Sequence, residues 1–288
     1  MTTLTKKGPA ETIVLRHISS SQIWIYIVCA LLILTTIYGF ITIETKGVNL
    51  LEAAKKTASY FALMFGTPKA VPSHFGVVDE SFWKLTFSSL NLVLQTLSLA
   101  VLTTLIGAVV ALILGLFAAS NLTNRKVSSI LKSIIAFIRA VPTVLWVLIF
   151  AIGAGLGAAA AVIGMSFHTV GYLMKAYAES FEELDHSVIE ALRASGASWI
   201  QIVFQAVLPS SITQIISWTF IRLEINFAVA VAMGAAAGAG GIGFNLFMSA
   251  SYYFNICEIG FITYQILIVA LIMEIAASRL KAKLRLQT

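Results

Sequence analysis

The sequence predicts an all-α, polytopic integral membrane protein with about six transmembrane helices and a cytoplasmic helical element. Of its 288 residues, 59% are hydrophobic and only 11% are charged, whereas soluble domains have about 25% charged residues. Apolar runs of about 20 residues, enough to cross a bilayer, recur along the chain. The net charge of +6 comes from basic residues at the ends of these runs. That placement favours membrane orientation over nucleic-acid binding.

The expected transmembrane spans are residues 23–43, 85–119, 134–154, 156–176, 210–235 and 259–278. The first run is too long for a signal-peptide core and no small-residue cleavage site follows it, so we expect it to remain as a span. Residues 44–84 form a polar connection, with a surface-lying helix expected over Leu50–Phe65. We therefore divide the chain into an N-terminal segment, 1–80, and a membrane core, 81–288.

The distribution of lysine and arginine predicts the orientation. Arg125, Lys126 and Arg193 lie in short connections on one side, whereas all basic residues expected on the other side lie in the long 44–84 connection. Short cytoplasmic loops carry the excess of basic residues. Both termini and the 187–209 element are therefore expected in the cytoplasm.

Residues 187–209 read as two short helices separated by a break. Ser187 with Glu190 matches an S-x-x-E capping box, which predicts a helix that begins one residue after the serine. Gly196 can take the left-handed conformation that ends this helix. Ser198 with Gln201 forms a second box and predicts the start of the next helix.

The same residues resemble the coupling motif of ABC-transporter permeases, which is E-A-A, three residues, G, nine residues, then I-x-L-P. Here it is Glu190-Ala191-Leu192, Gly196 and Ala206–Pro209, with Leu192 and Ala206 departing from the pattern. The resemblance implies that Glu190, Ala191, Leu192 and Gly196 couple the chain to an ATPase. Capping alone would also account for Glu190.

Further stretches look like the permeases of phosphonate importers, within a superfamily that includes methionine permeases. They are residues 121–125, 139–142, 168–173, 178–185, 222–226 and 238–243, and the resemblance covers Phe87 to Leu284. It implies a homodimer in a prokaryotic plasma membrane, with two cytoplasmic ATPase subunits and an extracytoplasmic phosphonate-binding protein. ATP and magnesium would bind the ATPases, and this chain would need no cofactor. An importer of phosphite, a phosphate ester or methionine is the alternative, followed by a channel or an intramembrane enzyme.

Charged residues within the spans are the candidates for the transport pathway. An Arg or Asp at the bilayer centre costs roughly 2.5–3.5 kcal/mol, yet Arg222 and Glu224 lie near the middle of the 210–235 span. At about 100° per residue, Glu224 falls on one polar face while Arg222 and Asn226 fall on nearly the opposite one. Either Arg222 faces a water-filled route and attracts an anion, or it pairs with a carboxylate elsewhere and locks the bundle.

Two other polar residues within the expected membrane core have simpler explanations than ligand binding. We expect His168 to bond between helices rather than to bind a ligand. We expect Arg139 to reach the cytoplasmic headgroups at the start of the 134–154 span, with Pro142 kinking that helix.

Gly238, Gly240 and Gly243 match G-x-G-x-x-G, but a dinucleotide site needs a preceding strand. We expect an outer turn with close helix packing. The family resemblance implies that this turn, with Gly241, is an outer gate. The chain has no G-x-x-x-x-G-K-[ST], H-E-x-x-H or G-x-S-x-G motif, which argues against P-loop ATP binding and against an enzyme of those types.

Overall fold

The computed structural model describes residues 20–42, 47, 49–65 and 82–285, and all regular secondary structure among them is helical. Contacts divide the chain into two compact units, 1–56 and 57–288. The first unit holds helix α1, Ser20–Thr42, and the beginning of α2, Leu50–Met64. The predicted boundary at residue 80 falls outside the described residues.

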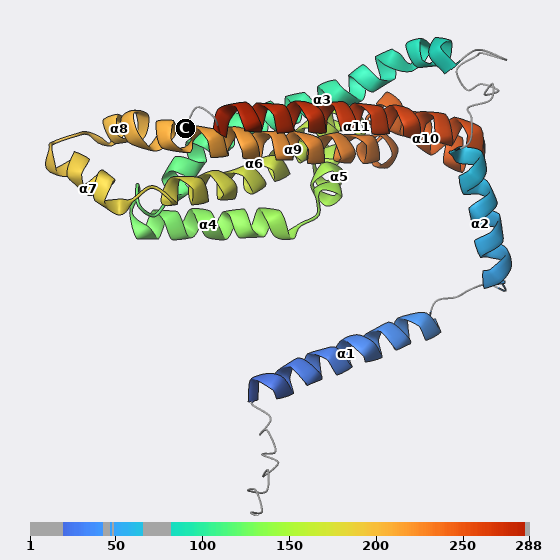
Figure 1. The fold of residues 1–288 in the computed structure, drawn as a ribbon, viewed down its shortest axis with the longest axis horizontal. Helices are drawn as coiled ribbons and strands as arrows, with labels where there is room; N and C mark the ends of the chain where they lie inside the picture. Colours follow the sequence, from blue (N-terminus) through green and yellow to red (C-terminus); the bar gives the residue numbers. More distant parts are fainter. Residues whose placement is uncertain (1–19, 43–46, 48, 66–81, 286–288) are drawn as a thin grey trace, which may run out of the picture. The chain divides into compact units, whose positions relative to one another are not determined.

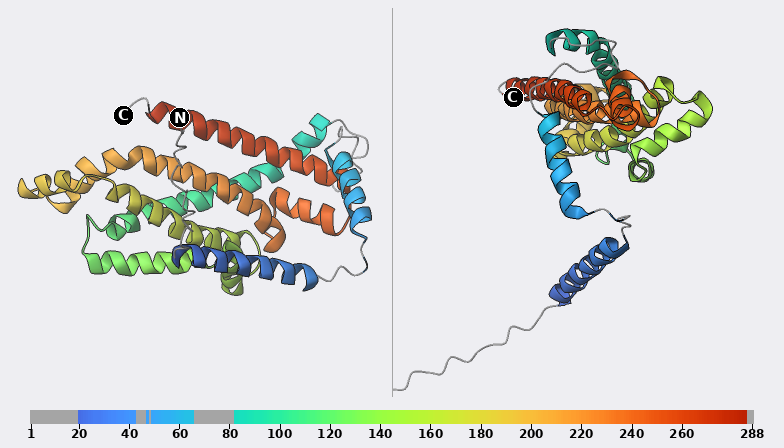
Figure 2. Two further views of the ribbon diagram at one scale, coloured as in Figure 1. Left: turned by 60° about the horizontal axis from the view of Figure 1, so that its bottom comes forward. Right: turned by 90° about the vertical axis from the view of Figure 1, so that its right-hand side faces the viewer.

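The second unit contains the end of α2 and all later helices. These are α3 (Phe82–Ala118), α4 (Arg125–Ala140), α5 (Thr143–Ala154), α6 (Ala158–Glu182), α7 (His186–Ala194), α8 (Trp199–Ile202), the π-helical turn η1 (Val203–Val207), α9 (Leu208–Ala236), α10 (Gly241–Ser251) and α11 (Ile256–Arg285). In Figure 1, α4, α6, α9 and α11 run side by side. The helices α7 and α8 lie at one end of this bundle, called here the coupling end, and α10 lies toward the other end, as the left view of Figure 2 also shows.

Four helices in the described residues are long and apolar enough to cross a membrane, or five if the bent pair α4–α5 counts as one span. The predicted number of six is therefore approximate. The expected span 134–154 is wrong as a single helix, because α4 and α5 meet at 91°. Pro142 lacks an N–H and disfavours helix in the residue before it, and Val141 is accordingly extended.

Helix α6 is the centre of the bundle, with more than half of its residues buried. It packs against α3 through Gly107, Ala111 and Gly115, which are spaced four residues apart and so share one face of α3. A Cβ on Gly107 would lie 2.4 Å from Cγ2 of Thr169. Small residues at this seam let the two helix backbones approach closely, as in other membrane bundles.

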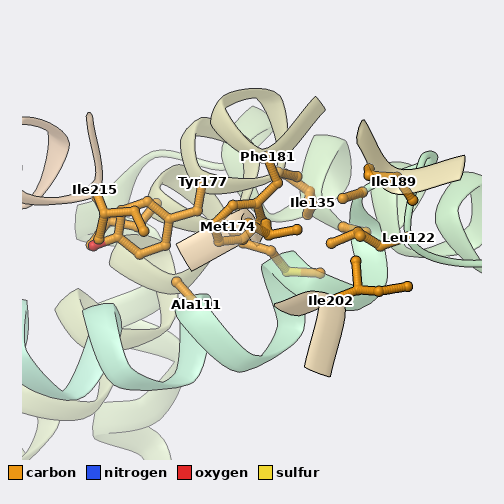
Figure 3. Packing of buried hydrophobic residues seen from close by; sticks show 14 residues of the cluster. Ala111, Leu122, Ile135, Met174, Tyr177, Phe181, Ile189, Ile202 and Ile215 are labelled. Carbon is orange, nitrogen blue, oxygen red and sulfur yellow. The ribbon is translucent and has the colours of Figure 1, made fainter. Parts of the chain in front are cut away.

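The hydrophobic core continues from α6 into the coupling end. Tyr177 and Phe181 of α6 pack in one cluster with Ile189 of α7 and Ile202 of α8, all of them buried (Figure 3). The cluster also takes in Leu122 of the α3–α4 connection. The short helices at this end are therefore fixed to the bundle by the same core that holds α3 and α6 together.

Candidate coupling surface and transport pathway

Helix α7 begins earlier than the sequence predicted. The Asp185 carboxylate caps it by accepting a hydrogen bond from the Ser187 N–H at 2.9 Å, which lowers the pKa of that carboxyl group. The predicted capping box of Ser187 with Glu190 is therefore wrong. Asp185 competes successfully because aspartate is among the best N-caps and stands two residues earlier. Glu190 lies instead on the exposed surface, 3.5 Å from Nδ1 of His186.

The break after α7 is a glycine turn, as predicted. Gly196 has φ +87°, the Gly196 N–H donates to the Arg193 carbonyl at 3.0 Å, and the Ala197 N–H donates to the Leu192 carbonyl at 3.0 Å. This pair of bonds is the Schellman motif that ends many helices. The turn leads directly into the next helix start, so the direction of α7 relative to α8 depends on a backbone conformation that suits glycine.

The second predicted helix start is confirmed. The Ser198 N–H donates to Oε1 of Gln201 at 2.7 Å, and the Gln201 N–H donates to Oγ of Ser198 at 3.4 Å, which is a complete capping box. The helix that begins there does not stop before the membrane span. It continues through the π-helical turn η1 into α9, so Trp199–Ala236 is one helix that meets the criteria for a span. The π-turn ends at Val207, two residues before Pro209, which has no N–H to donate.

The residues of the coupling motif divide between surface and core. Glu190, Ala191 and Gly196 are exposed, whereas Leu192 is half-buried against the core cluster next to the fully buried Ile189. Leucine therefore replaces the alanine of the family pattern at a position that packs inward. The exposed residues form the part of α7 that another protein can reach.

The α3–α4 connection, residues 119–124, ties the coupling helices to the bundle. The Arg193 guanidinium donates to the Asn121 carbonyl at 3.1 Å, and the Trp199 indole N–H donates to the Leu122 carbonyl at 3.1 Å. The Asn121 amide in turn donates to the Phe181 carbonyl of α6 at 2.8 Å. Sequence reasoning missed these contacts, because carbonyl acceptors leave no mark in a sequence. These bonds therefore join α6, α7 and α8 to the residues between α3 and α4.

Further along α9, the predicted division into two polar faces is confirmed. Arg222 is 2% exposed; its Nε donates to the Thr169 hydroxyl at 3.2 Å, and its Nη2 lies 3.0 Å from Nδ1 of His168. Asn226 donates to the hydroxyls of Thr104, at 2.8 Å, and Thr169, at 3.0 Å. Arg222 and Asn226 therefore join α9 to α6 and α3, and His168 bonds between helices as expected.

Glu224 does not belong to this cluster. It lines a separate cavity of about 280 Å³ between α9 and α11, together with Glu274 and Phe227. Of the three pathway candidates, Arg222 and Asn226 lie in one cluster and Glu224 lies apart from them. Among the described residues Arg222 forms no ion pair, so a locking carboxylate is not found within this part of the chain.

The glycine-rich segment connects α9 to α10. Gly238, Gly240 and Gly241 all have positive φ, and a Cβ on Gly243 would lie 1.9 Å from the Val231 carbonyl oxygen. The preceding element is a helix, so the context of a dinucleotide fold is missing. The expected turn with close helix packing is confirmed, and its role as an outer gate stays a prediction.

The family model for binding-protein-dependent transport system inner membrane components matches residues 111–285. The chain belongs to this family. It is similar to the phosphate-import permease protein PhnE of Mycolicibacterium smegmatis, with 33% identity over 54% of this chain and 29% of the relative. It is also similar to the phosphite transport system permease protein PtxC of Stutzerimonas stutzeri, with 34% identity over 53% of this chain and 56% of that one.

The matched region thus spans only part of these relatives, 29% of the first and 56% of the second. Among solved structures, the chain resembles the inward facing MetNI methionine ABC transporter with a TM-score of 0.62. That likeness covers 69% of this chain and 97% of the other at 21% identity. It shows the fold, an all-helical bundle.

Proposed function

We propose that this chain is the membrane permease subunit of an ATP-driven importer of phosphonates or closely related phosphorus oxyanions. The observation that carries the proposal is the α7–Gly196–α8 element, an exposed helix fixed to the bundle through a glycine turn. A channel or an intramembrane enzyme has no need of such a docking helix. The family match supports the transport class, and the names of its relatives support a phosphorus oxyanion.

In this proposal the coupling end faces the cytoplasm, and an ATPase subunit docks on the exposed residues of α7, including Glu190 and Ala191. Two copies of the chain pair, with the pathway between them, and an extracytoplasmic binding protein delivers the ligand. ATP binding draws the two ATPases together and moves the α7 helices. Because α8 is continuous with α9, this motion changes the position of α9 in the membrane and alternates the access of the pathway.

A phosphorus oxyanion needs such a carrier, because an ion with one or two negative charges cannot cross the hydrocarbon core of the bilayer unaided. Arg222 stays the candidate that attracts the anion, with Asn226 and Glu224 as further pathway candidates. A methionine importer is the second candidate, favoured by the methionine permeases among its relatives, such as the 29% identical protein named MetI in Pasteurella multocida. The ATPases, with ATP and magnesium, supply the energy, and this chain carries no catalytic group.

Growth on a phosphonate as the sole phosphorus source tests the proposal, in cells that can degrade the phosphonate internally. We expect deletion of the gene to abolish growth on the phosphonate, while growth on phosphate continues. A matched uptake assay with labelled methionine tests the alternative. Growth on phosphonate that does not depend on the chain, together with methionine uptake that does, would overturn the assigned substrate.

A further inference from the structure

Helix α4 has three faces when it is plotted at about 100° per residue. One face packs into the bundle, with Ser128, Leu131, Ile135 and Ile138. The second is exposed and apolar, with Val127, Ile130, Ile134 and Phe137. The third is exposed and polar, with Arg125, Ser129, Lys132, Ser133 and Arg139. A soluble surface helix would show two faces, so the apolar exposed face indicates lipid and the polar one indicates something else.

The polar face runs along the whole length of α4. Helix α4 begins at the coupling end and runs beside α6 (Figure 1), so Arg139 lies about 21 Å from Arg125 along the axis. The hydrocarbon core is about 30 Å thick. Arginine and lysine in contact with lipid at such depth are unfavourable, so this face borders water. The expected helix start at residue 134 is wrong, because α4 begins at Arg125, and the expected place of Arg139 at the headgroups depended on that start.

Helix α6 presents a matching stripe of polar side chains. His168, Tyr172, Lys175, Glu179 and Glu182 follow one another at alternating spacings of four and three residues, which places them on one face. A cavity of about 270 Å³ lies between α4 and α6, and its lining includes Lys132, Arg139, Lys175, Glu179 and Glu182. We call this cavity with its charged walls the α4–α6 groove.

The charges in the groove are balanced except at its deep end. Lys132 pairs with Glu182 at 2.7 Å and Lys175 with Glu179 at 3.3 Å. The Arg139 guanidinium makes no ion pair or hydrogen bond with any described residue. Its Cζ lies 5.9 Å from the centroid of the Tyr172 ring.

Arg222 reaches the same ring from α9. Its Cζ lies 5.1 Å from the Tyr172 centroid, so both guanidiniums are within the roughly 6 Å range of a cation–π contact. Arg222 uses two of the five N–H donors of a guanidinium in its bonds to His168 and Thr169. These bonds fix its orientation, while Arg139 is exposed to the groove. Two arginines, neither of them neutralised by a described carboxylate, therefore contact the Tyr172 ring, Arg139 from the groove and Arg222 from within the bundle.

We propose that Arg139 and Arg222, gathered around Tyr172, form an anion-binding station for a phosphorus oxyanion on its way through the membrane. The inference rests on the proposed function and names Arg139 as a specificity-determining residue for it. Guanidinium groups bind tetrahedral oxyanions through paired, charge-assisted hydrogen bonds. The paired lysines along the groove present walls of low net charge, so the anion passes them and stops at the unpaired arginines. The ammonium group of a zwitterion such as methionine would be repelled there.

Binding is measured on the complex of the permease with its ATPases in phosphatidylcholine nanodiscs, by ³¹P NMR line broadening of methylphosphonate. We expect Arg139→Gln to weaken methylphosphonate binding about tenfold, as for the loss of a charge-assisted contact. Arg139→Lys keeps the charge, so its affinity for methylphosphonate should lie between that of the wild type and that of Arg139→Gln. Arg125→Gln is the matched control, because it removes the same charge from the shallow end of the same face, and it should change binding by less than about twofold.

Phosphate headgroups of lipids share this chemistry, so a second series uses nanodiscs that contain phosphatidylglycerol. Methylphosphonate binding that is unchanged by phosphatidylglycerol supports the station. Loss of methylphosphonate binding in phosphatidylglycerol, with less phosphatidylglycerol retained by Arg139→Gln, would assign the groove to a lipid and overturn the proposal.

Phosphonate uptake by cells separates this inference from the function on which it rests. If wild-type cells import phosphonate and Arg139→Gln behaves as Arg125→Gln in both uptake and binding, the proposed anion-binding station at Arg139 and Arg222 is refuted. The proposed transport function then still stands. If the wild-type chain neither imports nor binds methylphosphonate, both proposals fall. Co-purification of the ATPases with each variant shows that the complex is intact.

Discussion

The glycine turn at Gly196 gives the sharpest test of the coupling surface. Its φ of +87° lies in the left-handed region, and a Cβ added there meets nothing within 4 Å. Gly196→Ala therefore adds backbone strain without a clash, about 1–2 kcal/mol. That corresponds to a loss of about 5- to 30-fold in the ratio of ordered to disordered turn. Gly196→Pro is far more disruptive, because proline needs φ near −65° and removes the N–H that bonds to Arg193.

The assay is the amount of ATPase that co-purifies with the permease, followed by the ratio of phosphonate imported to ATP hydrolysed. We expect the order Gly, Asn, Ala, Pro at position 196, since asparagine tolerates the left-handed region better than alanine does. Gly155→Ala is the matched control, because Gly155 has φ +76° and equally open surroundings at the end of α5, away from the coupling end. If Gly155→Ala weakens the ATPase association as much as Gly196→Ala, or if Gly196→Pro leaves it intact, the coupling assignment is wrong.

Three further variants test other parts of the structure. Gly243→Ala places a Cβ against a backbone carbonyl of α9 and should destabilise by about 1–3 kcal/mol, lowering Tm by about 2–4 °C per kcal/mol, whereas Gly153→Ala in open space should not lower Tm. Trp199→Phe removes the indole donor to the α3–α4 connection at a cost of about 1 kcal/mol, and we expect less import per ATP hydrolysed with ATPase binding retained. Burial raises the pKa of Glu182, but its bonds from a lysine and a backbone N–H outweigh this and hold the pKa below its usual range. Its stabilisation is therefore present at pH 7 and is lost as the pH falls through that lowered pKa, so the Tm difference between wild type and Glu182→Gln should shrink in acid.

Features that depend on neighbouring residues in the chain could be predicted from the sequence. The second capping box, the left-handed Gly196 and the two polar faces of α9 are of this kind, because turn chemistry and helical periodicity act over a few residues. The N-cap of α7 was predicted wrongly, although the predicted cap Ser187 and the observed cap Asp185 are only two residues apart. Aspartate and serine cap helices about equally well, and the structure uses Asp185.

Features that depend on distant segments could not be predicted. The bonds from Arg193 and Trp199 end on backbone carbonyls of residues more than seventy positions earlier, and no side-chain pattern encodes such acceptors. The grouping of Arg139 with Arg222 also escaped, because the break at Pro142 is a right-angle bend rather than a kink. Once α4 starts at Arg125, the helix carries Arg139 away from the coupling end and beside Tyr172.

The continuity of α8 with α9 links the coupling surface to the pathway by simple geometry. Trp199 and Arg222 are on one helix, about 35 Å apart along its axis. A tilt of 5° about the level of Trp199 would move the level of Arg222 sideways by about 3 Å, which is as long as the bond between Arg222 and His168. If the ATPase docks on α7, as we propose, a small motion of α7 and α8 would therefore be sufficient to release Arg222 from α6. The same motion changes its distance from Arg139, which is carried by α4. In the proposed mechanism, docking of the ATPase would thus switch the two arginines between an arrangement that holds the anion and one that releases it.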